Sequence, residues 1–210
     1  MVLRWMGWKA AGAPPELDRY VLIAAPHTSN WDFILTKALA WYYDLDIRWM
    51  GKHTLFRFPY GWFMRAMGGI PITRHRRSNV VDASAALFAE RDSLVLTVPA
   101  EGTRSPVEFW KSGFYHIAHK AGVPIVLGYL DYGTKTGGFG PVIEPSGDQK
   151  RDMELIRAFY ADKVGRHPDK FLEPRLRGEQ DDGDLAQLTS DAAPRSADLD
   201  ASAVEVQQPE

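Results

Sequence analysis

The chain has no cysteine among its 210 residues, so disulfide bridges, thiolate zinc sites and cysteine nucleophiles are all excluded. It also lacks an uninterrupted apolar run of roughly 18 residues, and we therefore expect no membrane-spanning helix. The first residues include Arg4 and Lys9 and have no apolar core long enough for a secretory signal. The basic residues form no stripe and accompany no motif that reads bases, so no nucleic-acid partner is expected. The expected location is cytoplasmic, peripheral on the inner membrane face.

The chain contains enough apolar residues to form the core of one folded domain. Hydrophobic residues make up 45% of it and aromatic residues 12%, which is too apolar for global disorder. The net charge of −2 is unevenly distributed: residues 177–210 hold nine acidic residues against two arginines, which leaves 23 basic and 18 acidic residues in 1–176. We therefore divide the chain into an N-terminal, possibly interfacial segment (1–19), a globular domain (20–176) and an acidic disordered tail (177–210).

Apolar runs and helical patterns alternate through most of the globular domain. Strands are expected at 20–26, 47–52, 69–74, 93–99, 123–132 and 139–144, and helices at 30–41, 79–91, 111–121 and 152–164. Residues 53–67 are expected to be helical or irregular, and Pro71 suggests that its strand lies at an edge or carries a bulge. The alternation predicts an α/β fold with a mostly parallel sheet covered by helices on both faces. Functional residues of such folds lie beyond the carboxyl ends of the strands.

His27 and Asp32 stand five positions apart, after the first expected strand and at the start of a helix. A helix N-terminus favours the ionised form of a carboxylate, so Asp32 could accept a hydrogen bond from one nitrogen of His27 and fix its tautomer. The other ring nitrogen could then act as a general base toward an alcohol. The alternative is structural, with His27 packing or capping and Asp32 serving only as a helix-start acid. A metal site is not expected, because no third ligand lies nearby in the sequence.

A second polar segment, residues 101–105, follows the strongly apolar run at 93–99. Gly102 would let a ligand approach the backbone, Arg104 offers a planar fork for phosphate oxygens, and Thr103 adds a hydroxyl. Glu101 could bind a glycerol hydroxyl or hold Arg104 in place. The open alternative is a polar surface turn in which Glu101 and Arg104 pair with each other.

Two further cations, Arg74 and Lys111, are candidate phosphate ligands. Arg74 ends the strand at 69–74 and could bind a second phosphate oxygen, whereas Arg76 and Arg77 are interpreted as a solvated basic loop. Lys111 stands at the start of the next helix, where it either faces phosphate or is an ordinary helix-start residue. His27, Arg74 and Glu101 all follow strands, so we expect them at one edge of the sheet.

Four blocks in this order resemble the glycerophospholipid acyltransferases, typified by the 1-acylglycerol-3-phosphate (lysophosphatidate) acyltransferases. The blocks are His27 to Asp32, Gly68 to Arg74, Glu101 to Arg104, and Val123 to Val126, and residues 110–113 are similar to the family's Lys-x-Gly segment. Two departures occur: Ala100 replaces the proline that usually precedes the glutamate, and Pro71 interrupts the second block.

The resemblance implies an O-acyltransferase domain at 20–176 that moves a fatty acyl group to the free hydroxyl of a lysophospholipid or related lysolipid. His27 would be the general base and Asp32 its orienting partner. The acceptor would be bound by Arg74, Glu101, Gly102, Thr103, Arg104 and Lys111. The donor would be a thioester of coenzyme A or acyl carrier protein, used as co-substrate, with no bound cofactor. A thioesterase or lipid hydrolase with the same base, and a non-catalytic lipid-binding protein, are the alternatives.

Lipid substrates would require contact with a membrane surface, and two segments have suitable composition. Residues 1–8 combine Trp5 and Trp8 with Arg4, and residues 55–67 combine five aromatic side chains with two arginines. Aromatic residues beside cations are typical of the headgroup zone of a bilayer. The alternative is that these aromatics fill the core, and we expect this for about half of them.

Overall fold

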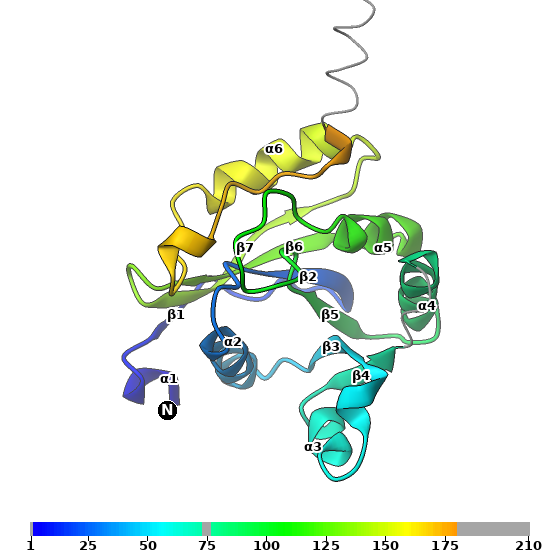
Figure 1. The fold of residues 1–210 in the computed structure, drawn as a ribbon, viewed down its shortest axis with the longest axis horizontal. Coiled ribbons are helices and arrows are strands. Elements are labelled where there is room, and N and C mark those ends of the chain that lie inside the picture. Colours follow the sequence, from blue (N-terminus) through cyan, green and yellow to red (C-terminus); the bar gives the residue numbers. More distant parts are fainter. Residues whose placement is uncertain (1, 73–76, 180–210) are drawn as a thin grey trace, which may run out of the picture.

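A computed structural model of the protein describes residues 2–72 and 77–179 (Figure 1). Its centre is a seven-stranded sheet in the order β1-β7-β6-β2-β5-β3-β4. All neighbouring strands are parallel except β6 and β7, which are antiparallel. The strands are β1 (Lys9–Ala11), β2 (Arg19–Ala25), β3 (Ile47–Lys52), β4 (Gly69–Ile72), β5 (Leu94–Val98), β6 (Ile125–Asp131) and β7 (Thr136–Ile143).

Helices cover both faces of this sheet, as the alternating pattern predicts. One face carries α2, with α1 beside it, and the other carries α4, α5 and α6 (Figure 1). The helices are α1 (Val2–Trp5), α2 (Trp31–Tyr42), α3 (Gly61–Ala66), α4 (Arg77–Ala89), α5 (Gly113–Ala121) and α6 (Gln149–Tyr160), with short 3-10 turns η1 (His53–Phe56) and η2 (Pro168–Lys170). The α/β architecture with a mostly parallel sheet is therefore confirmed, with one antiparallel pair making it mixed.

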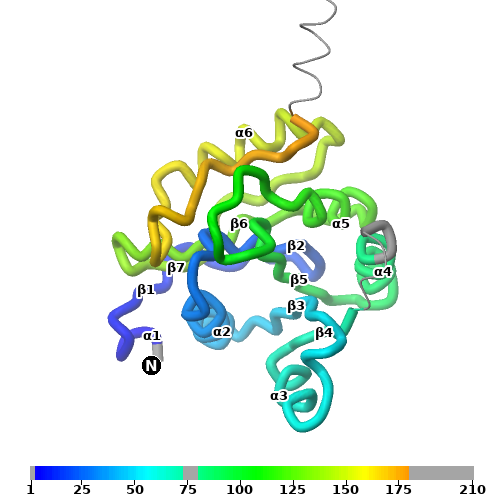
Figure 2. The backbone as a smooth tube through the Cα atoms, viewed as in Figure 1, coloured from blue at the N-terminus to red at the C-terminus, as the bar shows by residue number. Residues whose placement is uncertain are grey.

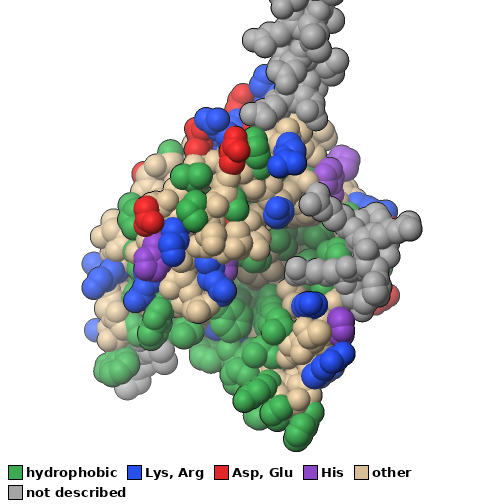
Figure 3. Space-filling view, viewed as in Figure 1, with side chains coloured by type: hydrophobic (Ala, Val, Ile, Leu, Met, Phe, Trp, Pro, Cys, Tyr) green, Lys and Arg blue, Asp and Glu red, His purple; other side chains and the backbone are tan. Residues whose placement is uncertain are grey.

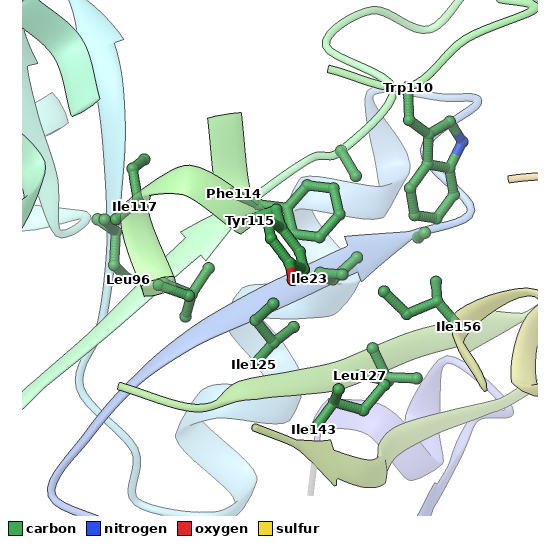
Figure 4. Packing of buried hydrophobic residues seen from close by; sticks show 14 of the residues in the cluster. Ile23, Leu96, Trp110, Phe114, Tyr115, Ile117, Ile125, Leu127, Ile143 and Ile156 are labelled. Carbon is green, nitrogen blue, oxygen red and sulfur yellow. The ribbon is translucent and has the colours of Figure 1, made fainter. Parts of the chain in front are cut away.

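Strand β2 is buried on both faces, and its alternating side chains belong to two hydrophobic clusters. Val21 and Ile23 pack with α5 and α6, in the cluster of Figure 4, whereas Tyr20 and Leu22 pack toward α2 with Ala40. Aliphatic residues from β5, β6 and β7 complete the larger cluster, with Phe114 and Ile156 contributed by the helices. A strand buried on both sides fixes the loop that follows it, and in β2 that loop carries His27.

The structure refines several expected boundaries. α6 begins at Gln149 rather than at 152, because the Asp148 side chain accepts a hydrogen bond from the Arg151 amide and caps the helix. Pro71 lies in β4 at the edge of the sheet, as its missing N–H favours. The sequence pattern did not indicate α1, β1 or η2, which are too short to leave a periodic signal.

Some expectations fall outside the described residues. Arg74 and most of the acidic tail, residues 180–210, are among them. Among the residues described, no helix is both long enough and apolar enough to cross a membrane.

Candidate active site

The loop between β2 and α2 brings His27 and Asp32 together at the carboxyl edge of the sheet. Nδ1 of His27 lies 3.5 Å from Oδ2 of Asp32. Asp32 is in the first turn of α2 and is only 3% exposed, whereas the His27 side chain keeps 20% of its surface. The imidazole therefore faces a fixed carboxylate on one side and retains access to a ligand on the other.

Three donors other than His27 hold the carboxylate of Asp32. Its Oδ2 accepts hydrogen bonds from the amides of Thr28 (2.7 Å) and Ser29 (2.8 Å), and its Oδ1 accepts one from the Tyr132 hydroxyl (2.7 Å). By accepting from these two amides, the Asp32 carboxylate holds the preceding loop against the start of α2, as in a capping box. The position of the carboxylate is thus set by the backbone of the loop that carries His27.

The hydrogen bonds to Asp32 also determine its ionisation state. Burial alone would raise its pKa, but hydrogen bonds from His27 and Tyr132 outweigh that effect and hold the pKa of Asp32 below its usual value. Burial, followed by the bond to Asp32, raises the pKa of Tyr132, so its hydroxyl remains a donor. Asp32 is therefore ionised near neutral pH and able to orient an imidazole.

Glu101 also holds the loop that carries His27. Its Oε1 accepts a hydrogen bond from the His27 amide (2.7 Å), and the side chain is only 4% exposed. Its Oε2 is buried and has no hydrogen-bond partner within residues 2–72 and 77–179, and burial raises the pKa of Glu101 to about 7. The structure thus places Glu101 against the backbone of His27, and the surface pair between Glu101 and Arg104 is not formed.

The rest of the 101–105 segment lies at the surface. Gly102 has a φ of +70°, and a Cβ there would lie 2.9 Å from Cγ of Lys111, so the lysine stem packs over the glycine. Nη1 of Arg104 donates a hydrogen bond to Oδ1 of Asn30, directly before α2, and Thr103 is exposed. Arg104 therefore stands near the His27 loop and Lys111 packs on Gly102 of the same segment, while the position of Arg74 is not described.

An apolar pocket of about 520 Å³ opens beside His27 and extends between α2 and the sheet. His27, Asp32 and Arg104 stand among its lining residues, together with Met64 of α3. The remaining lining is mainly aliphatic and aromatic, including Leu22, Ala24, Phe33, Ile34, Leu39, Ala40, Ile47, Trp49, Met50, Leu130 and Phe139. A pocket with this lining suits a hydrocarbon chain, with the imidazole at its polar end.

Sequence reasoning missed the segment that follows α6, which runs back to the His27 loop (Figure 2). The His167 amide donates a hydrogen bond to Oγ1 of Thr28 (3.2 Å). A Cβ on Gly165 would lie 2.9 Å from Thr28 Cγ2 and 3.2 Å from Pro26 Cβ, so a larger residue there would have to displace Thr28. Only a three-dimensional structure reveals these contacts, because more than a hundred residues separate the partners.

Among the described residues, no three histidine, aspartate or glutamate side chains gather closely enough to hold a metal ion. The groups that the structure does place at this edge are an imidazole beside a carboxylate, an apolar pocket and a nearby arginine.

Known proteins share the fold and the family of this chain. The fold is similar to that of the 1-acyl-sn-glycerophosphate (LPA) acyltransferase PlsC from Thermotoga maritima, with a TM-score of 0.55 and 19% sequence identity over 76% of this chain and 74% of that one. None of the curated proteins matches the chain significantly. The model of the Acyltransferase family matches residues 13–127, which include His27, Asp32 and the 101–105 segment. Because this match spans more than half of the sequence, the chain belongs to the Acyltransferase family.

Proposed function

We propose that this protein transfers a fatty acyl group from an acyl thioester to the free hydroxyl of a lysophospholipid, with His27 as the general base. The observation that carries the proposal is the pairing of His27 with ionised Asp32 at the mouth of an apolar pocket of about 520 Å³. Family membership supports the reaction class, and the lysophosphatidate-like acceptor rests on the motif resemblance together with the nearby Arg104.

The mechanism follows from the two ring nitrogens. Asp32 accepts from Nδ1–H, which leaves the lone pair of Nε2 free to take a proton. As the acceptor oxygen attacks the thioester carbonyl carbon, Nε2 removes the hydroxyl proton. The carbon–sulfur bond then breaks, and the leaving thiolate receives that proton from the imidazolium. An ester and a thiol result, and His27 is regenerated.

The donor acyl chain is assigned to the apolar pocket. Each buried methylene contributes roughly 0.8 kcal/mol of transfer free energy, so a long chain would be held firmly with its thioester near His27. We propose that the thiol portion, coenzyme A or acyl carrier protein, remains outside the pocket.

A membrane-facing surface is the second part of the proposal. Large apolar side chains of α1, α2, η1, α3 and the loop before α3 are exposed, and hydrophobic groups gather over these helices in Figure 3. We call this surface the aromatic face; it comprises Trp5, Trp31, Ile34, Trp41, Tyr42, Leu55, Phe58, Tyr60, Trp62 and Phe63. Phe58 is 97% exposed and Trp62 72%, which is costly in water and favourable at a headgroup zone. Ile34 also lines the pocket, so a lipid bound at this face would be close to its entrance.

The activity is tested by thiol release from palmitoyl-CoA, with and without lysophosphatidate in detergent. Release that requires both the acceptor and His27, lost in His27→Ala by about 10²-fold or more, would support the transferase. Release without an acceptor would indicate a thioesterase instead. Equal activity of His27→Ala and wild type would refute the mechanism.

Membrane contact is tested separately by flotation with vesicles containing phosphatidylglycerol. The double variant Phe58→Ser, Trp62→Ser should lose binding, because it removes two of the most exposed aromatic groups. Leu155→Ser is the matched control, since Leu155 is 55% exposed on α6, over the other face of the sheet. Equal binding of both variants and the wild type would contradict the assignment.

A further inference from the structure

Two guanidinium groups flank the first residues of α2, close to His27. Arg104 donates a hydrogen bond to Asn30, and the guanidinium carbon of Arg166 lies 5.5 Å from the ring centroid of Trp31. Asn30 and Trp31 are consecutive, so the two cations approach neighbouring positions from different parts of the chain. Arg166 also interacts with the Tyr132 hydroxyl, the group that donates to Asp32.

The backbone that carries Arg166 is fastened on both sides. The Val164 amide donates to Oδ1 of Asp131 (3.2 Å), and the Val164 carbonyl accepts from the Tyr132 amide (2.8 Å). On the other side, the His167 amide bonds to Thr28. Arg166 is therefore held at the rim of the site by a fixed turn, and the Trp31 ring further restricts its side chain.

Among the described residues, no carboxylate neutralises the charges of these two arginines. Several other arginines form ion pairs, including Arg48, Arg157 and Arg175, but within residues 2–72 and 77–179 neither Arg104 nor Arg166 has a carboxylate within 4.0 Å. Both are exposed. Asp32, the nearby acid, is buried and already accepts hydrogen bonds at both oxygens. The rim beside His27 thus presents two positive groups to an incoming anion.

We propose that Arg166, supplied by a segment outside the matched family region, is a second cationic arm beside Arg104 and binds a phosphate monoester next to His27. The inference rests on the proposed acyl transfer. A guanidinium suits phosphate because its planar fork can donate two parallel hydrogen bonds. In a lysophosphatidate acceptor the reacting hydroxyl and the phosphate are borne on adjacent glycerol carbons, so a phosphate held here would bring that hydroxyl to the base. Phosphates of coenzyme A offer the same chemistry.

Steady-state kinetics of Arg166→Gln distinguish the two phosphate sources. A KM for lysophosphatidate raised about tenfold or more, with the KM for monoacylglycerol unchanged, would assign the arm to the acceptor. A KM raised for palmitoyl-CoA but not for palmitoyl-pantetheine would assign it to the donor. Arg166→Lys should recover only part of the loss, because a lysine keeps the charge without the fork. Equal changes for substrates with and without phosphate, or no change, would overturn the proposal.

A binding measurement keeps this inference separate from the catalytic proposal. Broadening of the ³¹P resonance of glycerol 3-phosphate by the wild-type protein should be lost in Arg166→Gln, even if no acyl transfer is found. Arg177→Gln is the matched control, because Arg177 also lies 5.5 Å from an aromatic centroid, that of Phe109, and is also exposed. Failure of the wild type to bind, or equal binding by Arg166→Gln, would refute the subsite. Absence of transfer with intact, Arg166-dependent binding would refute only the reaction.

Discussion

Replacing Glu101 by glutamine should change how the stability of the protein depends on pH. Burial raises the pKa of Glu101 from 4.5 to about 7, so the native protein retains a proton that the unfolded chain has already released. Between these two values, rising pH favours the unfolded state. The stability contributed by the protonated group is fully present below pH 4.5 and is lost as the pH rises through about 7.

The size of the effect follows from the shift. Each unit of pKa difference corresponds to roughly 1.4 kcal/mol, so wild type should lose about 3 kcal/mol across this window from Glu101 alone. Glutamine does not titrate, and its carbonyl oxygen can still accept from the His27 amide. The stability of Glu101→Gln minus that of wild type should therefore rise by about 3 kcal/mol between pH 4.5 and 7 and then level off.

Urea unfolding followed by tryptophan fluorescence, repeated from pH 4.5 to 8.5, measures this difference directly. Other titrating groups cancel in the comparison between variant and wild type. Glu144→Gln is a suitable control for the substitution itself, since Glu144 is exposed directly after β7. A flat difference for Glu101→Gln would mean that Glu101 is ionised in the folded protein, and the reasoning from burial would fail.

Three other substitutions test the surroundings of His27 and Asp32 and the lining of the apolar pocket. Tyr132→Phe removes a donor to Asp32, so the pKa of Asp32 should rise and the stability measured by urea unfolding above pH 4 should fall by about 1 kcal/mol; a stability that matches wild type across the pH range would contradict this. Gly165→Ala should cost roughly 1–3 kcal/mol in urea unfolding and lower kcat, because the new methyl group would push Thr28 and its loop. Ala40→Leu should favour shorter acyl donors, with KM for long chains rising about fourfold for each methylene excluded from the pocket; unchanged chain-length preference would place the acyl chain elsewhere.

Local signals in the sequence were sufficient for most of the fold. The apolar runs of β2 and β5 and the helix start at Asn30 are visible without coordinates, because burial on both faces and helix initiation leave compositional traces. The edge position of β4 was likewise indicated by Pro71. Parallel topology then implied that His27 and Glu101 share one edge of the sheet.

Contacts between distant residues left no such trace. Tyr132 and Gly165 belong to segments with no motif of their own, and their roles depend on how β6 and the end of α6 meet the His27 loop. The burial of Glu101 was missed for the same reason, since a glutamate beside an arginine resembles a surface pair until its depth is known. Propensity and spacing describe neighbours along the chain, whereas these side chains act on neighbours in space.

The central position of β2 governs when catalytic competence can arise during folding. Arg19 pairs with Leu94 and Val21 with Ile125, so the middle of the sheet forms by closing long loops, a slow step in topologies of this kind. The His27 loop is then fastened by Tyr132 and His167, which lie still later in the sequence. A chain emerging from the ribosome therefore carries His27 and Asp32 long before Tyr132 and His167 are available to hold their loop. If the proposed function is right, activity would arise only when nearly the whole domain has been synthesised and has folded.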